Sequence, residues 1–161
     1  MSQMPIQDKF LESLEHATRA LQVADHMTYI TFPLVKEKRL LLKVLSELGS
    51  SIFSIINAIL QYEYTWKRIQ LYQDARANFD TFRRLAPRYN VSPEQLKVLT
   101  EILTLSEKHK KSPFEFVKND KIVIMSDGLA PSYLTLEKIK AYLIETKDFL
   151  RKANLKIKSP V

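Results

Sequence analysis

A repeating apolar pattern in residues 41–62 constrains the fold of this chain more than any other sequence feature. Large apolar residues recur there at alternating spacings of four and three, which is the heptad pattern of packed helices. The repeat consists of Leu41, Leu45, Leu48, Ile52, Ile55, Ile59 and Tyr62. A second apolar line lies beside it, so this helix must be covered on two sides. It is therefore either the central helix of a bundle or half of a dimer. A homodimer would use the first six residues of the repeat as its oligomer interface.

The limits of this helix are set by its breakers. Pro33 is suited to the first turn of a helix, so it predicts that the second helix opens there. With no breaker before Asp74, the helix extends from Leu34 to about Tyr72, or breaks near Thr65. Gly49 costs about 1 kcal/mol relative to Ala inside a helix, which indicates the close approach of a neighbouring backbone.

Capping signals predict the remaining helices. Apolar spacings of four and three predict a first helix over 6–26. Asp74 caps a third helix, which Pro87 ends, and Ser92-Pro93 opens a fourth helix that ends in the cationic run 108–111. Ser112-Pro113 repeats the signature, so a short helix that buries Phe114, Phe116 or both is expected.

The pattern changes period near the C-terminal end. Residues 121–125 form a strand signal, Asp127-Gly128 is a hairpin turn signal, and 129–134 returns as a strand that Pro131 restricts to a sheet edge. Thr135 caps a last helix. The expected fold is mainly α: a multi-helix bundle around a long central helix, with one short β-hairpin at about 121–134. One domain spans 1–155, and 156–161 forms a basic tail.

Composition excludes several classes of function. Two glycines among 161 residues cannot supply a glycine-rich phosphate loop, and the absence of cysteine excludes disulfides, thiol catalysis and cysteine zinc sites. No secretory signal is visible. The longest uncharged stretch, 48–62, is shorter than the roughly 20 residues of a spanning helix. We therefore expect a cytoplasmic protein with no membrane partner.

The three histidines offer little for metal chemistry. Glu12 and His16 form half of a metal site, and no matching pair exists elsewhere, so no metal or other cofactor is expected. Arg19 and His26 lie two helical turns apart on one face. This spacing resembles the Arg…His motif of the HEPN family of helical ribonucleases and nucleotide-binding bundles. The resemblance implies that Arg19 stabilises a phosphate while His26 acts as acid or base in RNA cleavage.

Positive charge is concentrated in the middle of the chain. The formal net charge is +7, and residues 64–111 hold ten basic and five acidic side chains. Tyr64, Trp66 and Tyr72 lie among the basic residues at the start of this stretch. Cations that pair with phosphate and aromatics that stack are what a nucleic-acid surface requires. The candidate nucleic-acid-binding residues are Lys67, Arg68, Arg76, Arg83, Arg84, Arg88, Lys108, Lys110 and Lys111. A narrower hypothesis, a winged helix-turn-helix made of the fourth helix, the short helix and the hairpin, adds Lys118 and Lys121.

We therefore expect a non-catalytic helical interaction module. Its expected partners are another protein, a second copy through the heptad helix, or RNA or DNA on the basic faces. The alternative function is a HEPN-like RNA-acting nuclease that uses Arg19 and His26. An enzyme is the less favoured class, because no nucleophile with a base and an oxyanion donor is visible in the spacing.

Overall fold

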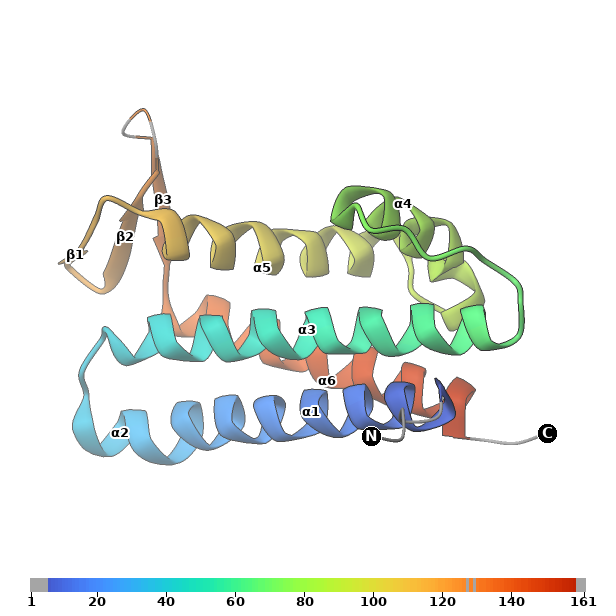
Figure 1. Cartoon of the computed structure of the whole chain (residues 1–161). Helices are drawn as coiled ribbons and strands as arrows, with labels where there is room; N and C mark the ends of the chain where they lie inside the picture. Colours follow the sequence, from blue (N-terminus) through green and yellow to red (C-terminus); the bar gives the residue numbers. More distant parts are fainter. Residues whose placement is uncertain (1–5, 127, 129, 159–161) are drawn as a thin grey trace, which may run out of the picture.

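The computed structural model describes residues 6–126, 128 and 130–158, and these residues form a helical bundle with a small sheet at one end (Figure 1). The long helices are α1 (Ile6–His26), α3 (Leu40–Thr65), α5 (Pro93–Lys111) and α6 (Leu136–Lys158). The shorter ones are α2 (Phe32–Val35) and α4 (Ala75–Leu85). Strands β1 (Phe114–Lys118), β2 (Lys121–Met125) and β3 (Pro131–Leu134) form an antiparallel sheet in that order. The expected mainly α bundle with β structure before the last helix is confirmed.

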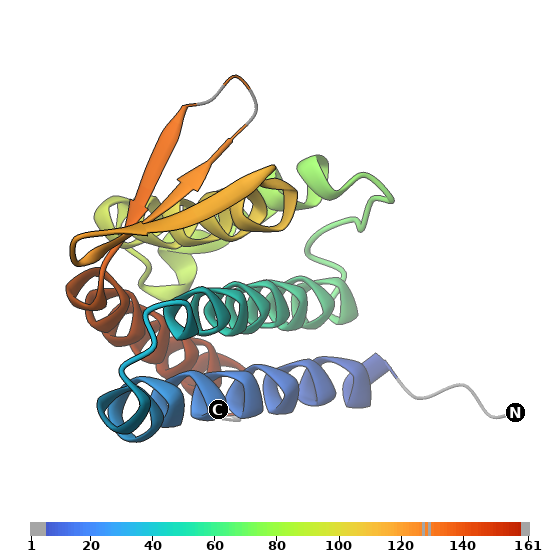
Figure 2. The ribbon, with the colours of Figure 1, turned by 90° about the vertical axis from the view of Figure 1, so that its left-hand side faces the viewer.

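Helix α3 is the central helix of the bundle. It packs against α1, α4, α5 and α6, and Figures 1 and 2 both show it between α1 and α5. The six residues of the proposed oligomer interface, from Leu41 to Ile59, are at most 1% exposed. Packing within one chain therefore accounts for the two-sided apolarity, and these side chains are not accessible to a second copy. By length and apolarity alone α3 could cross a membrane, but 61% of its most apolar stretch is buried in the bundle.

Helix α3 begins six residues later than the sequence predicts. The first helix ends at His26 as expected, but the chain stays helical through a π-helical turn (Met27–Thr31) and then through α2. Pro33 does lie in the first turn of α2, yet Lys36 adopts a left-handed conformation with φ 57° and ends that helix. Residues 36–39 are all charged and give a helix no apolar face to bury. Of the two alternatives for its other end, a continuous helix to about Tyr72 or a break near Thr65, the structure has the break, because α3 ends at Thr65.

Three predicted helix caps are present. Asp74 accepts a hydrogen bond from the Arg76 backbone N–H at 3.1 Å, and Ser92 accepts one from that of Gln95 at 3.0 Å. Thr135 Oγ1 accepts one from the Lys138 N–H at 3.2 Å. These bonds satisfy N–H groups that lack a partner within the helix, so α4, α5 and α6 begin where the sequence predicts.

The fourth predicted cap is wrong. Ser112 does not start a short helix, because its hydroxyl donates to the carbonyl oxygens of Phe114 and Met125, at 2.7 and 2.6 Å. Residues 114–118 form strand β1, which pairs with β2. Phe114 and Phe116 lie on the exposed side of this strand rather than in the core. The helix, helix, wing order of a winged helix-turn-helix is therefore absent from this part of the chain.

The structure contains both strands that the sequence predicts near the C-terminal end. Strand β2 covers 121–125 as predicted, and β3 pairs with it as an edge strand that begins at Pro131. Of the predicted turn, Asp127 lies outside the described residues, while Gly128 has a φ of 83°, which favours glycine.

Helix α6 extends farther than the sequence predicts. It runs to Lys158 with Ile157 buried, so residues 156–158 of the predicted tail belong to the helix.

Gly49 allows α3 and α5 to approach each other closely. A Cβ atom at Gly49 would lie 2.7 Å from Ser106 Oγ and 2.9 Å from Ser106 Cβ, on α5. The predicted close neighbour is thus a side chain rather than a backbone. Both residues are buried, so the helices have to separate to admit another carbon.

We expect Gly49→Ala to destabilise the protein, although alanine favours a helix by about 1 kcal/mol. Overpacking typically costs about 1 to 3 kcal/mol, so the net loss is about 1 kcal/mol in urea denaturation. Adding Ser106→Gly removes the clash, so the double variant should be more stable than the sum of the single changes predicts. Simple additivity would contradict a clash between these two positions.

A carboxylate on α6 joins it to the start of α5. Asp148 accepts hydrogen bonds from Arg151 (2.7 Å) and Gln95 (3.0 Å), and it forms an ion pair with Lys152 (3.0 Å). The bond from Arg151, with those from Lys152 and Gln95, lowers the pKa of Asp148 to about 2. An aspartate in the unfolded chain titrates near about 3.9. The contribution of Asp148 to stability is therefore present above about pH 4 and is lost as the pH falls through about 2.

We expect Asp148→Asn to lower the free energy of unfolding at neutral pH, because the charged acceptor is lost. The difference from the wild type should shrink as the pH falls from 4 to 2, and urea titrations at each pH measure it. Asp80→Asn, a change of an exposed carboxylate on α4, is the control. A difference that stays constant across this range would contradict the role of Asp148.

Candidate nucleic-acid interface

The outer face of α5 is the floor of a groove. Two adjoining cavities, of about 660 and 510 Å³, follow this face and share Thr100, Thr104 and Lys108. Figure 1 shows α5 extending from α4 at one end to the sheet at the other. We call the two cavities together the α5 groove. Its walls come from α4, from β3 and from the beginning of α6.

Five cations from three helices line the α5 groove. They are Arg83 on α4, Lys97, Lys108 and Lys111 on α5, and Lys138 on α6. Side-chain contacts hold three of them in place. The Arg83 guanidinium lies 5.2 Å from the Phe79 ring centre, Lys108 donates to Ser132 Oγ at 3.4 Å, and Lys138 donates to the Tyr133 carbonyl at 3.0 Å. The groove is thus positive at both of its walls.

The two carboxylates of the α5 groove each have a donor. Tyr142 donates a hydrogen bond of 2.6 Å to Glu101, and Lys111 lies 3.6 Å from Glu107. Burial of the Tyr142 phenol, with the bond to Glu101, raises its pKa above the ordinary value. Tyr142 therefore stays protonated at neutral pH and acts as a donor. The groove keeps an excess of three positive charges.

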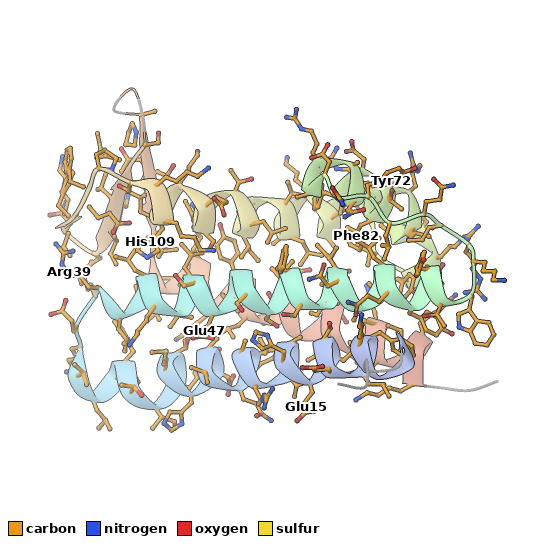
Figure 3. The ribbon with its side chains drawn as sticks, viewed as in Figure 1. Glu15, Arg39, Glu47, Tyr72, Phe82 and His109 are labelled. Carbon is orange, nitrogen blue, oxygen red and sulfur yellow. The ribbon has the colours of Figure 1, made fainter. Side chains whose placement is uncertain are left out.

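Three other predicted cations surround a different cavity. Arg68, Arg84 and Arg88 line a space of about 250 Å³ beside Tyr72. Figure 3 shows Tyr72 near α4, at the end of the molecule away from the sheet. The adjacent residues Arg83 and Arg84 therefore point to different cavities, because Arg83 lines the α5 groove and Arg84 lines this one.

A buried carboxylate organises this second group. Glu63, near the end of α3, is 1% exposed, and its oxygens lie 2.7 Å from Arg68 Nη1 and 3.8 Å from Arg88 Nη1. We call Glu63, Arg68 and Arg88 the Glu63 cluster. Burial of the neighbouring Tyr89, together with the charge of Glu63, raises the pKa of that phenol. Sequence reasoning missed Glu63, although a carboxylate directly after a heptad repeat is a usable signal.

The structure brings together only part of the predicted nucleic-acid set. Arg83, Lys108 and Lys111 share the α5 groove, and Lys110 is adjacent, 4.0 Å from Glu107. Lys67 is exposed on the α3–α4 connection, and Arg76 is exposed in the first turn of α4. Neither residue lines the α5 groove or the cavity beside Tyr72. Lys138, Tyr133 and Tyr142 were missed, since they join the groove only through the fold. Lys97 was also left out of the predicted set, although it lies on α5 in the same basic stretch as Lys108.

Arg19 and His26 do not form a shared site. Arg19 is exposed and lies 3.9 Å from Glu15, whose outward position on α1 Figure 3 shows. His26 lines a cavity with Tyr29 and Lys147, and Arg19 is not among the lining residues. His16 bonds to Ser54 at 2.9 Å. Among the described residues, no three His, Cys, Asp or Glu side chains gather in a way that could hold a metal.

Comparison with known proteins adds no family. No protein-family model, no curated protein and no solved structure matches this chain. The geometry of the α5 groove and the residues that surround it are therefore the basis for assigning a function.

We expect Glu63→Ala to destabilise the protein by about 2 kcal/mol, because Arg68 and Arg88 lose a buried, charged acceptor. Arg88→Ala should cost less, since its 3.8 Å contact is longer and its side chain is largely exposed. Urea denaturation measures both. Glu107→Ala, which removes an exposed carboxylate paired with lysines, is the control. Equal losses for Glu63→Ala and Glu107→Ala would contradict the importance of burial.

Proposed function

We propose that the protein is a non-catalytic nucleic-acid-binding module that holds the phosphate backbone of a polynucleotide in the α5 groove. The observation that carries this proposal is the convergence of five cations from three helices on one groove, whose two carboxylates already have donors. Phosphate contacts supply most of the affinity in sequence-independent binding.

The dimensions of the α5 groove suit an extended anionic ligand. From Lys97 to Lys111 the helix rises about 21 Å, which spans several phosphates of one strand. Thr100 and Thr104 lie on the floor between these lysines. The Thr100 hydroxyl donates to the Leu96 carbonyl at 2.8 Å, so Thr104 is the one of the two placed to donate to a phosphate oxygen. A small anion would need a closed pocket rather than a long groove with dispersed cations.

The nuclease alternative has less support. A general acid or base has to reach the scissile phosphate together with the group that stabilises its charge. Arg19 is paired with Glu15, and His26 lines a different cavity surface. The α5 groove contains neither residue.

We expect the double variant Arg83→Glu/Lys97→Glu to bind RNA and DNA oligonucleotides at least tenfold more weakly than the wild type at low salt. Each lost phosphate contact should also reduce the slope of log K against log salt by about 0.7 for a single strand. Fluorescence anisotropy of labelled oligonucleotides across a salt series measures both quantities.

The matched control is Lys9→Glu/Lys43→Glu, which changes the net charge equally at exposed lysines outside the groove. An equal loss in both double variants would mean that net charge, rather than the α5 groove, drives binding. Arg84→Glu should weaken binding less than Arg83→Glu, because it does not line the groove. The absence of any salt-dependent binding by the wild type would refute the proposed function.

A further inference from the structure

The sheet has two faces of opposite character. Ile122, Ile124 and Leu134 are buried against the helices, so they define an inner face. Side chains alternate along a strand, and the register places the other set together on the outer face. The outer face consists of Phe114, Phe116, Lys118, Lys121, Val123, Met125, Pro131 and Tyr133. Figure 2 looks toward this end of the molecule and shows no other described element in front of the sheet.

Three aromatic rings are exposed on this outer face. Phe114, Phe116 and Tyr133 are 49%, 37% and 46% exposed. The two phenylalanine rings are stacked, with centres 6.0 Å apart and planes at 20°. Tyr133 lies across the sheet from Phe116, with Val123 between them in the register. Val123 itself is only 3% exposed, so the rings rather than this side chain form the accessible surface. Exposed aromatic surface of this kind on one face is typical of a binding site.

The outer face is also positively charged. It carries Lys118 and Lys121 and no carboxylate, and Lys121 Nζ lies 5.5 Å from the Tyr133 ring centre. Of the nearby carboxylates, Asp120 is paired with Lys38 at 2.8 Å, and Glu115 points to the other face. The face therefore combines flat apolar rings with uncompensated cations, which suits an anionic ligand that has flat apolar groups.

The sheet is fixed to the helices, so the rings are held in place before any ligand binds. Ser112 bonds to the β2 carbonyl of Met125, His109 pairs with Glu115, and Arg39 donates to the Glu115 carbonyl at 3.3 Å. Figure 3 shows Arg39 and His109 at the sheet end of the bundle. A fixed platform loses less conformational entropy when a ligand binds.

We propose that the outer face of the sheet stacks unpaired bases and that the nucleic acid bound by this protein is therefore single-stranded. The proposal rests on the function proposed for the α5 groove. Tyr133 belongs to both surfaces, since it lines the groove and lies on the outer face. A strand whose phosphates follow the groove reaches the sheet at this residue. Bases paired in a duplex cannot stack on the rings, whereas any unpaired base can.

The test uses a single-stranded oligonucleotide that contains 2-aminopurine and a hairpin duplex of the same composition. We expect Phe114→Ala and Phe116→Ala each to weaken single-strand binding about tenfold and to remove the quenching of 2-aminopurine that stacking causes. Their binding to the duplex should not change. Phe53→Ala, which truncates an exposed phenylalanine on α3, is the matched control and should behave as the wild type.

The outcomes separate the two proposals. If the groove variant Arg83→Glu/Lys97→Glu loses binding while both phenylalanine variants keep wild-type affinity and quenching, the stacking proposal is wrong and the groove remains. Equal affinity of the wild type for the duplex and the single strand would also overturn it. If the wild type binds neither oligonucleotide, both proposals fail. A wild-type dimer that Phe116→Ala dissociates in sedimentation would show that a second copy covers the face instead.

Discussion

The burial of helix α3 is the constraint on which the rest of the structure depends. An apolar surface that runs around most of a 26-residue helix has to be removed from water, and a single neighbouring helix cannot cover it. The chain solves this with α1 on one side, α5 on another, and α6 closing the space between them. Because each of these helices turns its apolar side inward, the outer faces remain available for polar and charged groups. The outer face of α5 is the one that α4 and the sheet border at its two ends.

This arrangement separates the side of α5 that packs into the core from the side that we propose binds nucleic acid. The inner side of α5 carries Leu99, Ile102 and Ser106, which are buried against the core, with Ser106 meeting Gly49. Its outer side carries the threonines and lysines of the α5 groove. Substitutions on the outer side therefore leave the core unchanged, which makes the charges there accessible to experiment. A substitution at the buried Glu63 does reach the interior. Its partner Arg68 lies on the connection between α3 and α4, and its partner Arg88 lies in the turn that follows α4.

The sequence predicts the features that depend on neighbouring residues and misses those that depend on distant ones. Caps at Asp74, Ser92 and Thr135 involve an N–H two or three residues away, so their signatures were sufficient. Ser112 carries the same Ser-Pro signature, but its hydroxyl bonds to a carbonyl thirteen residues later, in strand β2. Local pattern cannot reveal that competition. The same limit applies to the α5 groove. Arg83, Lys108 and Lys111 lie in a stretch rich in basic residues, so the sequence alone identifies them as candidates. Lys138 and Tyr133 are distant in sequence and reach the groove only because the sheet and α6 pack beside α5.

The position of α6 in the chain gives the fold an order of assembly. Helices α1 and α3 form a hairpin of near neighbours, and the strands of the sheet pair consecutively, so these parts close short loops. Helix α6 instead packs on α1 and α3 across a long intervening segment. During synthesis on the ribosome it emerges after all of its partners. Until then one apolar side of α3 faces water, so the nascent chain is exposed to aggregation in the interval before α6 docks.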